Sequence, residues 1–417
     1  MDIGVDALRD WLESGRPVTV LDIRPAVQRE EWSIPGSVPV DAQTAMRASD
    51  PSSIGGVTVP AGQPIVAVCA QGKSSILAVR AMREHGIDAM SLKGGMQAWS
   101  LAWNVADVEL TGSKAIVIQV RRTGKGCLSY IIGSDGEAAV VDASVDPEIY
   151  LRIAEERGLR ILYVLDTHVH ADHLSRSRAL AARCSAEVLL PDQDRVTYPF
   201  RALREGDSIT IGAIEIQALH TPGHTSESTS FLVDGRALLT GDTLFPGAVG
   251  RPDLAASSEQ ARKRAHLLHA TLQRIAQLAP ETWILPCHTS EPIPFDGRPC
   301  GARLSDVIRQ VDMMRASEDT FVEMLLSRIP QTPPTTSRSS GSTSGGNSQA
   351  WIPPSSRRAR TAAPSPRPGG ALGDDWADGH GNGKLDAVPR NSDSPKPVTA
   401  SKGGLWVWPS QPSTRSP

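Results

Sequence analysis

Hydrophobic and polar residues in the first part of the chain, residues 1–105, alternate between helical and extended periods. Two apolar runs of strand length, Val18–Ile23 and Ile65–Val68, stand among amphipathic segments at Asp6–Glu13 and Ser75–His85. Short apolar strands that alternate with helices are typical of a parallel sheet with helices on both faces. We therefore expect this part of the chain to form an α/β domain.

A second set of patterns covers residues 112–330. The segment Tyr130–Asp142 predicts a β-hairpin whose turn is Asp135-Gly136. Further apolar runs predict strands at Ile161–Leu165, Ile214–Leu219, Ala237–Thr240 and Trp283–Leu285. The clearest helical period lies at Ala261–Leu278. We expect these elements to form a second folded domain.

The last segment, residues 331–417, has no hydrophobic periodicity, consists largely of Ser, Pro, Gly, Thr and Arg, and contains no Glu. Such a composition cannot bury enough apolar surface to offset the chain entropy, so we expect a disordered tail. Its tryptophans leave two interpretations open. One is a linear binding segment around Leu405–Trp408, and the other, which we prefer, is a tail without a selected fold, such as the product of a shifted reading frame.

Composition narrows the class of protein. The 417 residues suffice for two or three domains, and the formal net charge of -3 argues against a general binder of nucleic acids or membrane surfaces. The N-terminus lacks the features of a secretory signal, and no apolar run approaches the ~18 residues that cross a bilayer. Five cysteines without a C-x-x-C pair predict a reducing compartment. We expect a cytoplasmic protein, and a homodimer is compatible with the sequence.

Residues of metal-ligand type follow the predicted strands of the second domain. The motifs T-H-V-H-A-D-H, H-T-P-G-H-T, G-D-T and P-C-H-T supply His168, His170, Asp172, His173, His224, Asp242 and His288. Imidazole and carboxylate ligands suit Zn(II) or Fe(II). Because ionisable groups recur where apolar strands stop, these residues predict one shared metal site at a sheet edge. We interpret three other histidines, His220, His266 and His269, as structural.

With these motifs, residues 112–330 resemble the metallo-β-lactamase superfamily, whose signature is H-x-H-x-D-H. The resemblance implies an αββα sandwich with the metal at one edge of the paired sheets. In dizinc members the matching residues hold two ions, the first on His168, His170 and His224, and the second on Asp172, His173 and His288, with Asp242 bridging.

Within this superfamily, the same motifs together with T-G-D-T-L-F and G-R-P-D-L (Gly250–Leu254) are similar to those of the persulfide dioxygenases. That family holds a single Fe(II) on residues matching His168, His224 and Asp242, a facial triad that leaves positions open for a persulfide sulfur and O2. The resemblance makes the other motif residues partners of these ligands, and it makes Arg251 a candidate for substrate binding.

Cys69 follows the strand predicted at Ile65–Val68 and opens the loop C-A-Q-G-K-S-S, which leads directly into a helix. Backbone N–H groups of such a loop and the helix N-terminus can stabilise a thiolate or a bound persulfide, and Lys73 adds positive charge as a substrate-binding candidate. We interpret the other cysteines as structural, although Cys287 adjoins His288 and could line its pocket.

The motifs L-D-I-R at 21–24, I-P-G-S-V at 34–38 and L-K-G-G-M-Q-A-W at 92–99 accompany this loop. Together they make the first domain resemble the rhodanese (sulfurtransferase) family. The resemblance implies that Cys69 is catalytic and carries sulfane sulfur as a persulfide.

Three functions are compatible with these features. The first is oxidation of a low-molecular-weight persulfide, such as glutathione persulfide, with O2 to sulfite, on one Fe(II) per chain. The second is thioester hydrolysis of the glyoxalase II kind, on two Zn(II) per chain that generate hydroxide. The third is a non-enzymatic sulfur carrier or regulatory module. We expect a small thiol or persulfide as the partner of the first two.

Overall fold

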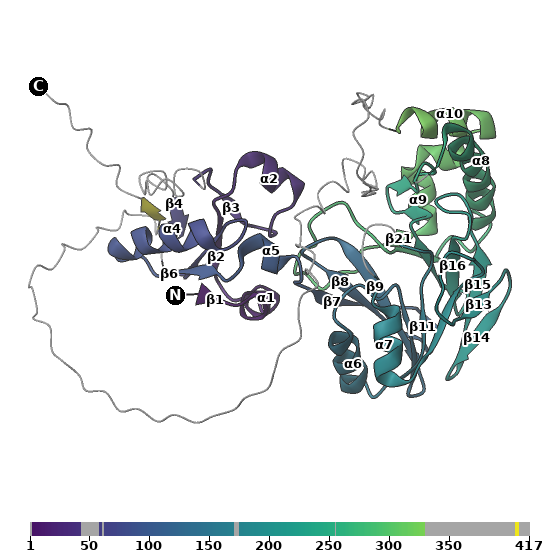
Figure 1. Cartoon of the computed structure of the whole chain (residues 1–417), viewed down its shortest axis with the longest axis horizontal. Helices are drawn as coiled ribbons and strands as arrows, with labels where there is room; N and C mark the ends of the chain where they lie inside the picture. Colours follow the sequence, from purple (N-terminus) through teal and green to yellow (C-terminus); the bar gives the residue numbers. More distant parts are fainter. Residues whose placement is uncertain are drawn as a thin grey trace, which may run out of the picture.

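The computed structural model describes residues 2–42, 58–60, 62–170, 175–254, 256–329 and 405–407. Figure 1 shows two folded parts side by side, an N-terminal domain and a larger second domain. The predicted disordered tail, residues 331–417, lies outside the described residues except for one strand. This strand, β22 (Leu405–Val407), pairs antiparallel with β4 (Thr58–Pro60).

The N-terminal domain is built on a five-stranded parallel sheet in the order β1-β6-β5-β2-β3. Its strands are β1 (Asp2–Ile3), β2 (Thr19–Asp22), β3 (Val38–Pro39), β5 (Ile65–Val68) and β6 (Ala89–Leu92). Its helices are α1 (Val5–Glu13), α2 (Ala26–Glu31), α4 (Lys73–Glu84) and α5 (Gly95–Trp99).

Both faces of this sheet are covered. In β5, Ile65 and Ala67 pack in one apolar cluster with side chains of α4, whereas Val66 and Val68 pack in another with side chains of α1 and α5. A strand buried on both faces is a continuous apolar run, as in the sequence of β5. The predicted α/β architecture is confirmed.

The second domain contains two larger sheets. The first, in the order β13-β12-β11-β10-β9-β8-β7, comprises β7 (Asn104–Val108), β8 (Ile116–Arg122), β9 (Cys127–Ser134), β10 (Glu137–Val141), β11 (Arg160–Leu165), β12 (Glu187–Pro191) and β13 (Arg201–Leu203). The second, in the order β14-β15-β16-β17-β20-β21, comprises β14 (Ser208–Ile211), β15 (Ile214–His220), β16 (Thr229–Val233), β17 (Ala237–Gly241), β20 (Trp283–Pro286) and β21 (Ala302–Arg303). A small hairpin pairs β18 (Leu244–Phe245) with β19 (Ala248–Val249).

Four layers result from the packing of these sheets. The main apolar cluster lies between the two sheets and includes Tyr130 and Phe231. The outer face of the first sheet is covered by α6 (Pro147–Glu156) and α7 (Ser177–Cys184). The outer face of the second is covered by α8 (Ser258–Ile275), α9 (Leu304–Gln310), the 3-10 helix η2 (Asp312–Arg315) and α10 (Glu318–Ser327). This is the predicted αββα sandwich.

Two observed boundaries, the start of α8 and the start of the second domain, differ from the predicted ones. The predicted hairpin is confirmed, and its turn residues Asp135 and Gly136 both have positive φ. Helix α8 begins before the predicted Ala261 because Ser257 and Gln260 form a capping box there. The strand β7 begins N-terminal to residue 112, where the second domain was expected to start, and it pairs with β8.

Direct contacts join the two domains. The indole of Trp32 donates a hydrogen bond to the carbonyl of Thr123 (2.9 Å), and Arg122 Nε donates to the carbonyl of Ser100 (2.8 Å). The rings of Trp99, in α5, and Phe295 lie 6.1 Å apart, and α5 is the helix nearest the second domain in Figure 1. The junction therefore combines buried aromatic surface with satisfied backbone groups.

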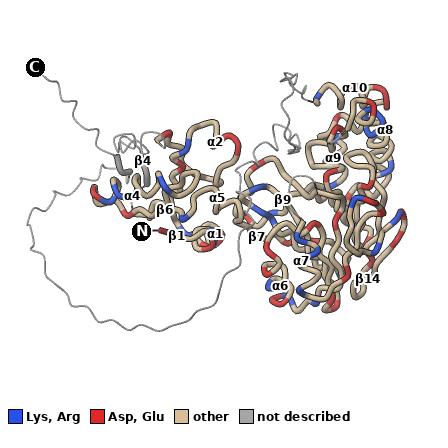
Figure 2. The backbone as a smooth tube through the Cα atoms, in the orientation of Figure 1, with Lys and Arg blue, Asp and Glu red and all other residues tan. Residues whose placement is uncertain are grey.

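Charges are interspersed rather than segregated. Figure 2 shows Lys and Arg among Asp and Glu along the described parts of both domains. The expectation that this chain does not bind nucleic acid stays a prediction. None of the helices in the described ranges combines the length and apolar character needed to cross a membrane.

Candidate metal centre

Five strand ends meet at one edge of the two sheets. The parallel strands β10 and β11 stay paired to their last residues, and so do β17 and β20, although each pair contains one register shift. Polar residues that follow such strands are therefore brought to a common edge. Together with the segment after β15, these ends supply Asp142, His168, His170, His224, Asp242, Cys287 and His288.

Three of the predicted ligands form a compact group. One ligand atom from each of His168, His224 and Asp242 lies within 4.8 Å of the other two. Oδ2 of Asp242 is 3.9 Å from Nε2 of His168 and 3.7 Å from Nε2 of His224. An ion about 2.1 Å from two ligand atoms separates them by about 3–4 Å. Two imidazoles and one carboxylate at this spacing fit Fe(II) or Zn(II).

Hydrogen bonds set the orientation of both imidazoles. The hydroxyl of Thr167 donates to Asp142 (3.0 Å), so it accepts from Nδ1–H of His168 (3.0 Å). The carbonyl of Arg251 accepts from Nδ1–H of His224 (3.0 Å). With the proton on Nδ1, each Nε2 carries the lone pair that faces Asp242, which is how ligating histidines are commonly oriented.

Protonation states favour cation binding. Burial, followed by the nearby His170, lowers the pKa of His168 from its ordinary 6.5 to about 3, so this imidazole is neutral near pH 7. Burial opposes ionisation of Asp242, but the surrounding imidazoles, that of His288 first, outweigh it and bring the pKa of this carboxyl below its ordinary value. Neutral imidazole and ionised carboxylate are the forms that bind metal.

The remaining predicted ligands have different surroundings. His170 donates through Nε2 to Oδ1 of Asp142 (3.1 Å), and His288 donates through Nδ1 to Oδ1 of Asp242 (2.7 Å). Asp172 and His173 lie outside the described residues. The structure therefore brings five of the predicted residues together, and the role of each as a ligand stays a prediction.

Sequence reasoning missed two supporting residues. Asp142 is buried at the end of β10 with a positive φ, and it accepts hydrogen bonds from both Thr167 and His170. The signal was present, since Asp142 follows an apolar strand like the predicted ligands do, but it was taken only as the end of a hairpin. Thr167 gave no distinct signal because threonine is common near strand ends.

His220, His266 and His269 lie apart from this cluster. His220 Nε2 bonds the carbonyl of Ser226 (2.9 Å) on an exposed segment, and the other two are on α8. Arg251 pairs its guanidinium with Asp253, so its predicted contact with substrate stays a prediction.

The Cys69 loop is in the N-terminal domain, between β5 and α4. The Sγ atom of Cys69 is buried, accepts from the backbone N–H of Gly72 (3.1 Å) and lies 3.3 Å from Ser75 Oγ. A Cβ on Gly95 would meet the Cys69 carbonyl at 2.2 Å, so only glycine fits beneath the loop. Lys73 is exposed at the first turn of α4. One backbone donor and one hydroxyl therefore lie at the sulfur, and the role of Cys69 as a sulfur carrier stays a prediction.

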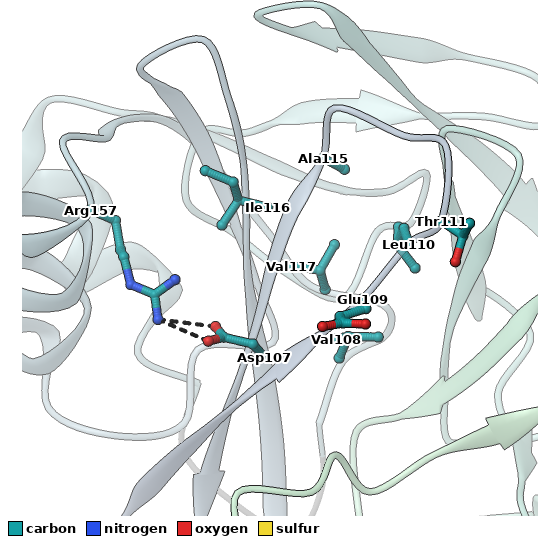
Figure 3. Close-up of a pocket in the computed structure, with 9 residues that line it drawn as sticks. All are labelled: Asp107, Val108, Glu109, Leu110, Thr111, Ala115, Ile116, Val117 and Arg157. Carbon is teal, nitrogen blue, oxygen red and sulfur yellow. Dashed lines mark hydrogen bonds and ion pairs between the residues drawn. The ribbon is translucent and has the colours of Figure 1, made fainter.

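A separate hollow of about 310 Å³ lies at the β7–β8 edge of the first sheet. Nine residues line it, and Arg157 and Asp107 form an ion pair at its rim (Figure 3). None of these lining residues belongs to the ligand cluster, so this hollow is not the candidate centre.

Comparison with known families agrees with both domains. The sequence profile of the metallo-β-lactamase superfamily matches residues 122–288, and the chain therefore contains a metallo-β-lactamase domain that carries the ligand cluster. The profile of the rhodanese-like domain matches residues 4–102, so the N-terminal domain, with Cys69, is rhodanese-like. Both predicted family resemblances are confirmed at this level.

Individual relatives cover parts of the chain. It is 37% identical over 136 residues to the hydroxyacylglutathione hydrolase of Anaeromyxobacter dehalogenans (strain 2CP-C), a match of 32% of this chain and 52% of that protein. It is 29% identical over 248 residues to a probable metallo-hydrolase of Burkholderia pseudomallei (strain 1710b), covering 48% and 82%. The crystal structure of ETHE1 from Myxococcus xanthus aligns with a TM-score of 0.45 and 28% identity, covering 52% and 92%. This chain thus spans about half the length of the first relative.

Replacing Thr167 by Val keeps the side-chain shape and removes the hydroxyl that orients His168. We expect the affinity for Zn(II) to fall about 10–100-fold, the usual effect of losing such a partner of a ligating histidine. Titration of the metal-free protein against a competing chelator measures this affinity. Thr271→Val, which removes a hydroxyl on α8 that donates to the Pro222 carbonyl, is the matched control. An unchanged affinity in Thr167→Val would refute the orienting role.

Proposed function

We propose that this chain oxidises a low-molecular-weight persulfide, such as glutathione persulfide. One persulfide, one O2 and one water yield one thiol and one sulfite, with release of two protons. The observation that carries the proposal is the group of His168, His224 and Asp242, in which two oriented imidazoles and one carboxylate face a common point. This is the ligand set of a two-His, one-carboxylate iron site.

The chain's own residues would hold and shield this centre. His168, His224 and Asp242 would bind Fe(II), which when bound supplies redox chemistry with O2 and open coordination positions. His168 and His224 are only 3% and 4% exposed, so water has little access to their ring edges. The anionic form of a persulfide would be attracted to the cation, and the neutral imidazoles add no competing negative charge.

The presence of the rhodanese-like domain supports the proposal that the substrate carries sulfane sulfur. A Cys69 persulfide would sit where the Gly72 N–H and the α4 N-terminus stabilise negative charge. One domain would then handle sulfane sulfur and the other would oxidise it. A thioester hydrolase has no evident use for such a loop.

Hydrolysis of a glutathione thioester on two zinc ions is the second candidate. Two observations favour it. The chain is 37% identical over 136 residues to a hydroxyacylglutathione hydrolase, and His170 and His288 lie beside the group of His168, His224 and Asp242. In this alternative the metal ions would generate hydroxide near neutral pH.

Two assays on the full-length protein separate these candidates. The iron-loaded protein is tested for O2 consumption and sulfite formation with glutathione persulfide, and the zinc-loaded protein for cleavage of a hydroxyacylglutathione thioester. Persulfide-dependent O2 uptake with equimolar sulfite supports the proposal. Thioester cleavage without O2 uptake would replace it by the second candidate.

Replacing Cys69 by Ser tests the rhodanese-like domain. Because the oxygen cannot form a persulfide, we expect sulfur transfer from thiosulfate to a thiol acceptor to fall about 1,000-fold or more, as for other lost nucleophiles. Cys184→Ser is the matched control, since the Cys184 thiol bonds a carbonyl of its own helix α7. Equal transfer rates in Cys69→Ser and the wild type would exclude Cys69 as the sulfur carrier.

A further inference from the structure

The two carboxylate oxygens of Asp242 face two different groups of ligand-type side chains. Oδ2 faces the Nε2 atoms of His168 and His224. Oδ1 accepts from Nδ1 of His288 (2.7 Å) and from the thiol of Cys287 (3.1 Å). One ligand atom from each of Asp242, Cys287 and His288 also lies within 4.8 Å of the other two. A carboxylate with a ligand group on each oxygen has the geometry of a bridge between two cations.

The main chain holds Cys287 firmly in this position. Because β17 and β20 are parallel neighbours, the N–H of Cys287 donates to the carbonyl of Gly241 (3.0 Å), just before Asp242. The Cys287 carbonyl accepts from the N–H of Leu128 in β9 (2.7 Å). The thiol therefore has a fixed place between the two sheets, and the residue is 1% exposed.

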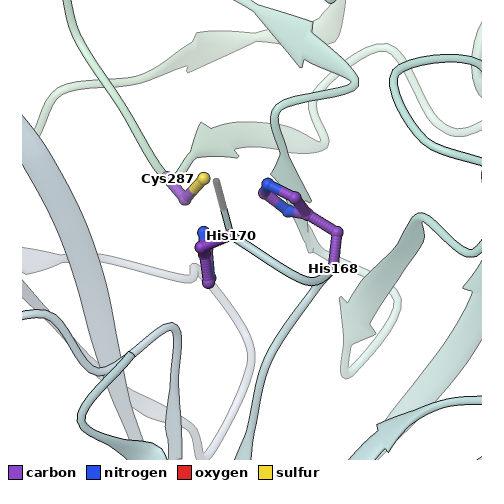
Figure 4. Close-up of side chains that lie close together, drawn as sticks. All are labelled: His168, His170 and Cys287. Atoms are coloured by element: carbon purple, nitrogen blue, oxygen red, sulfur yellow. The ribbon is translucent and has the colours of Figure 1, made fainter. Parts of the chain in front are cut away.

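Ligand-type side chains surround the Cys287 thiol. A buried cysteine is ordinarily a small apolar side chain, like Cys184 on α7. The Sγ of Cys287 instead lies 3.2 Å from Nδ1 of His288, and ligand atoms of His168 and His170 are within 4.8 Å of it and of each other. Figure 4 shows the two imidazoles, both on the segment after β11, close to the sulfur, which lies on the segment after β20.

We infer that Cys287 supplies a thiolate ligand to a second metal position, which it forms with His288 and Oδ1 of Asp242. This inference rests on the proposed metal centre and extends it by one ion. On binding, the S–H bond breaks, the sulfur bonds the cation and the proton leaves to solvent. Thiolate is a soft ligand, so this position selects Zn(II) or Co(II) over Mn(II) or Mg(II). The centre then combines nitrogen, oxygen and sulfur ligands.

Cobalt titration of the full-length metal-free protein tests the inference by absorption. Thiolate bound to Co(II) gives a near-ultraviolet charge-transfer band, which imidazole and carboxylate ligands do not give. We expect this band in the wild type with about two Co(II) bound per chain, and loss of the band with about one Co(II) in Cys287→Ser. Cys184→Ser is the matched control and should keep both the band and the stoichiometry.

The outcomes distinguish this inference from the proposed function. Visible Co(II) bands without a charge-transfer band in the wild type would overturn the thiolate ligand and leave the three-residue site intact, whether or not any variant folds. A band that persists in Cys287→Ser would assign it to another thiol and overturn the inference. No Co(II) binding by the wild type would overturn both the inference and the proposed metal centre.

Discussion

Replacing Asp242 by Ala is expected to lower persulfide oxidation about 1,000-fold, because a bound metal contributes several kcal/mol to the transition state. The carboxylate of Asp242 faces a ring nitrogen of each of three imidazoles, those of His168, His224 and His288. Without it, the imidazoles of His168 and His224 lose the carboxylate that would complete the three-residue ligand set. Iron content after loading should fall together with the rate, and elemental analysis of the purified variant measures it.

His220→Ala is the matched control for this variant. His220 is the last residue of β15. Its ring bonds the Ser226 carbonyl on an exposed segment, so iron content and rate should equal those of the wild type. If Asp242→Ala keeps full sulfur-oxidising activity, the metal domain is not the catalyst. A non-enzymatic sulfur carrier or regulatory module would then become the better interpretation of the chain.

Replacing Gly250 by Ala is expected to destabilise the centre although it replaces none of the proposed ligands. A Cβ at Gly250 would lie 2.1 Å from the carbonyl oxygen of Asp242 and 3.2 Å from Cβ of His224. Backbone must move to relieve such a contact, so we expect the free energy of unfolding to fall by about 3 kcal/mol. Because two ligand-bearing segments shift, metal affinity should fall about 10–100-fold.

Chemical denaturation and chelator titration of Gly250→Ala measure the two effects. Gly247→Ala, a few residues away in the turn between β18 and β19, is the control because nothing lies within 4 Å of its added Cβ. Wild-type stability and affinity in Gly250→Ala would show that the loop after β19 can move away from Asp242 at no cost. The close packing of Gly250 against the Asp242 carbonyl would then not be needed for metal binding.

The strands that lead to Cys69 and to the candidate ligands were predictable from local patterns. Apolar runs such as Ile65–Val68 and Ile214–Leu219 marked strands because their alternation or continuity reflects burial on one or two faces. Glycines and turn pairs such as Asp135-Gly136 marked the connections. The strand β8 was missed because its polar residues Gln119 and Arg121 are buried, which interrupts the apolar signal. Their polar groups are satisfied by Cys300 and Asn104, distant in sequence.

By itself the sequence determined the classes of both domains and the identity of the candidate ligands, because each motif is local and its residue types carry the chemistry. Only the tertiary structure decided which of them meet. The parallel register of β17 and β20 places Cys287 beside Asp242, and Asp142 reaches His168 through Thr167. These relations depend on strand pairing and hydrogen bonds between segments far apart in the chain, and no local pattern encodes such distances.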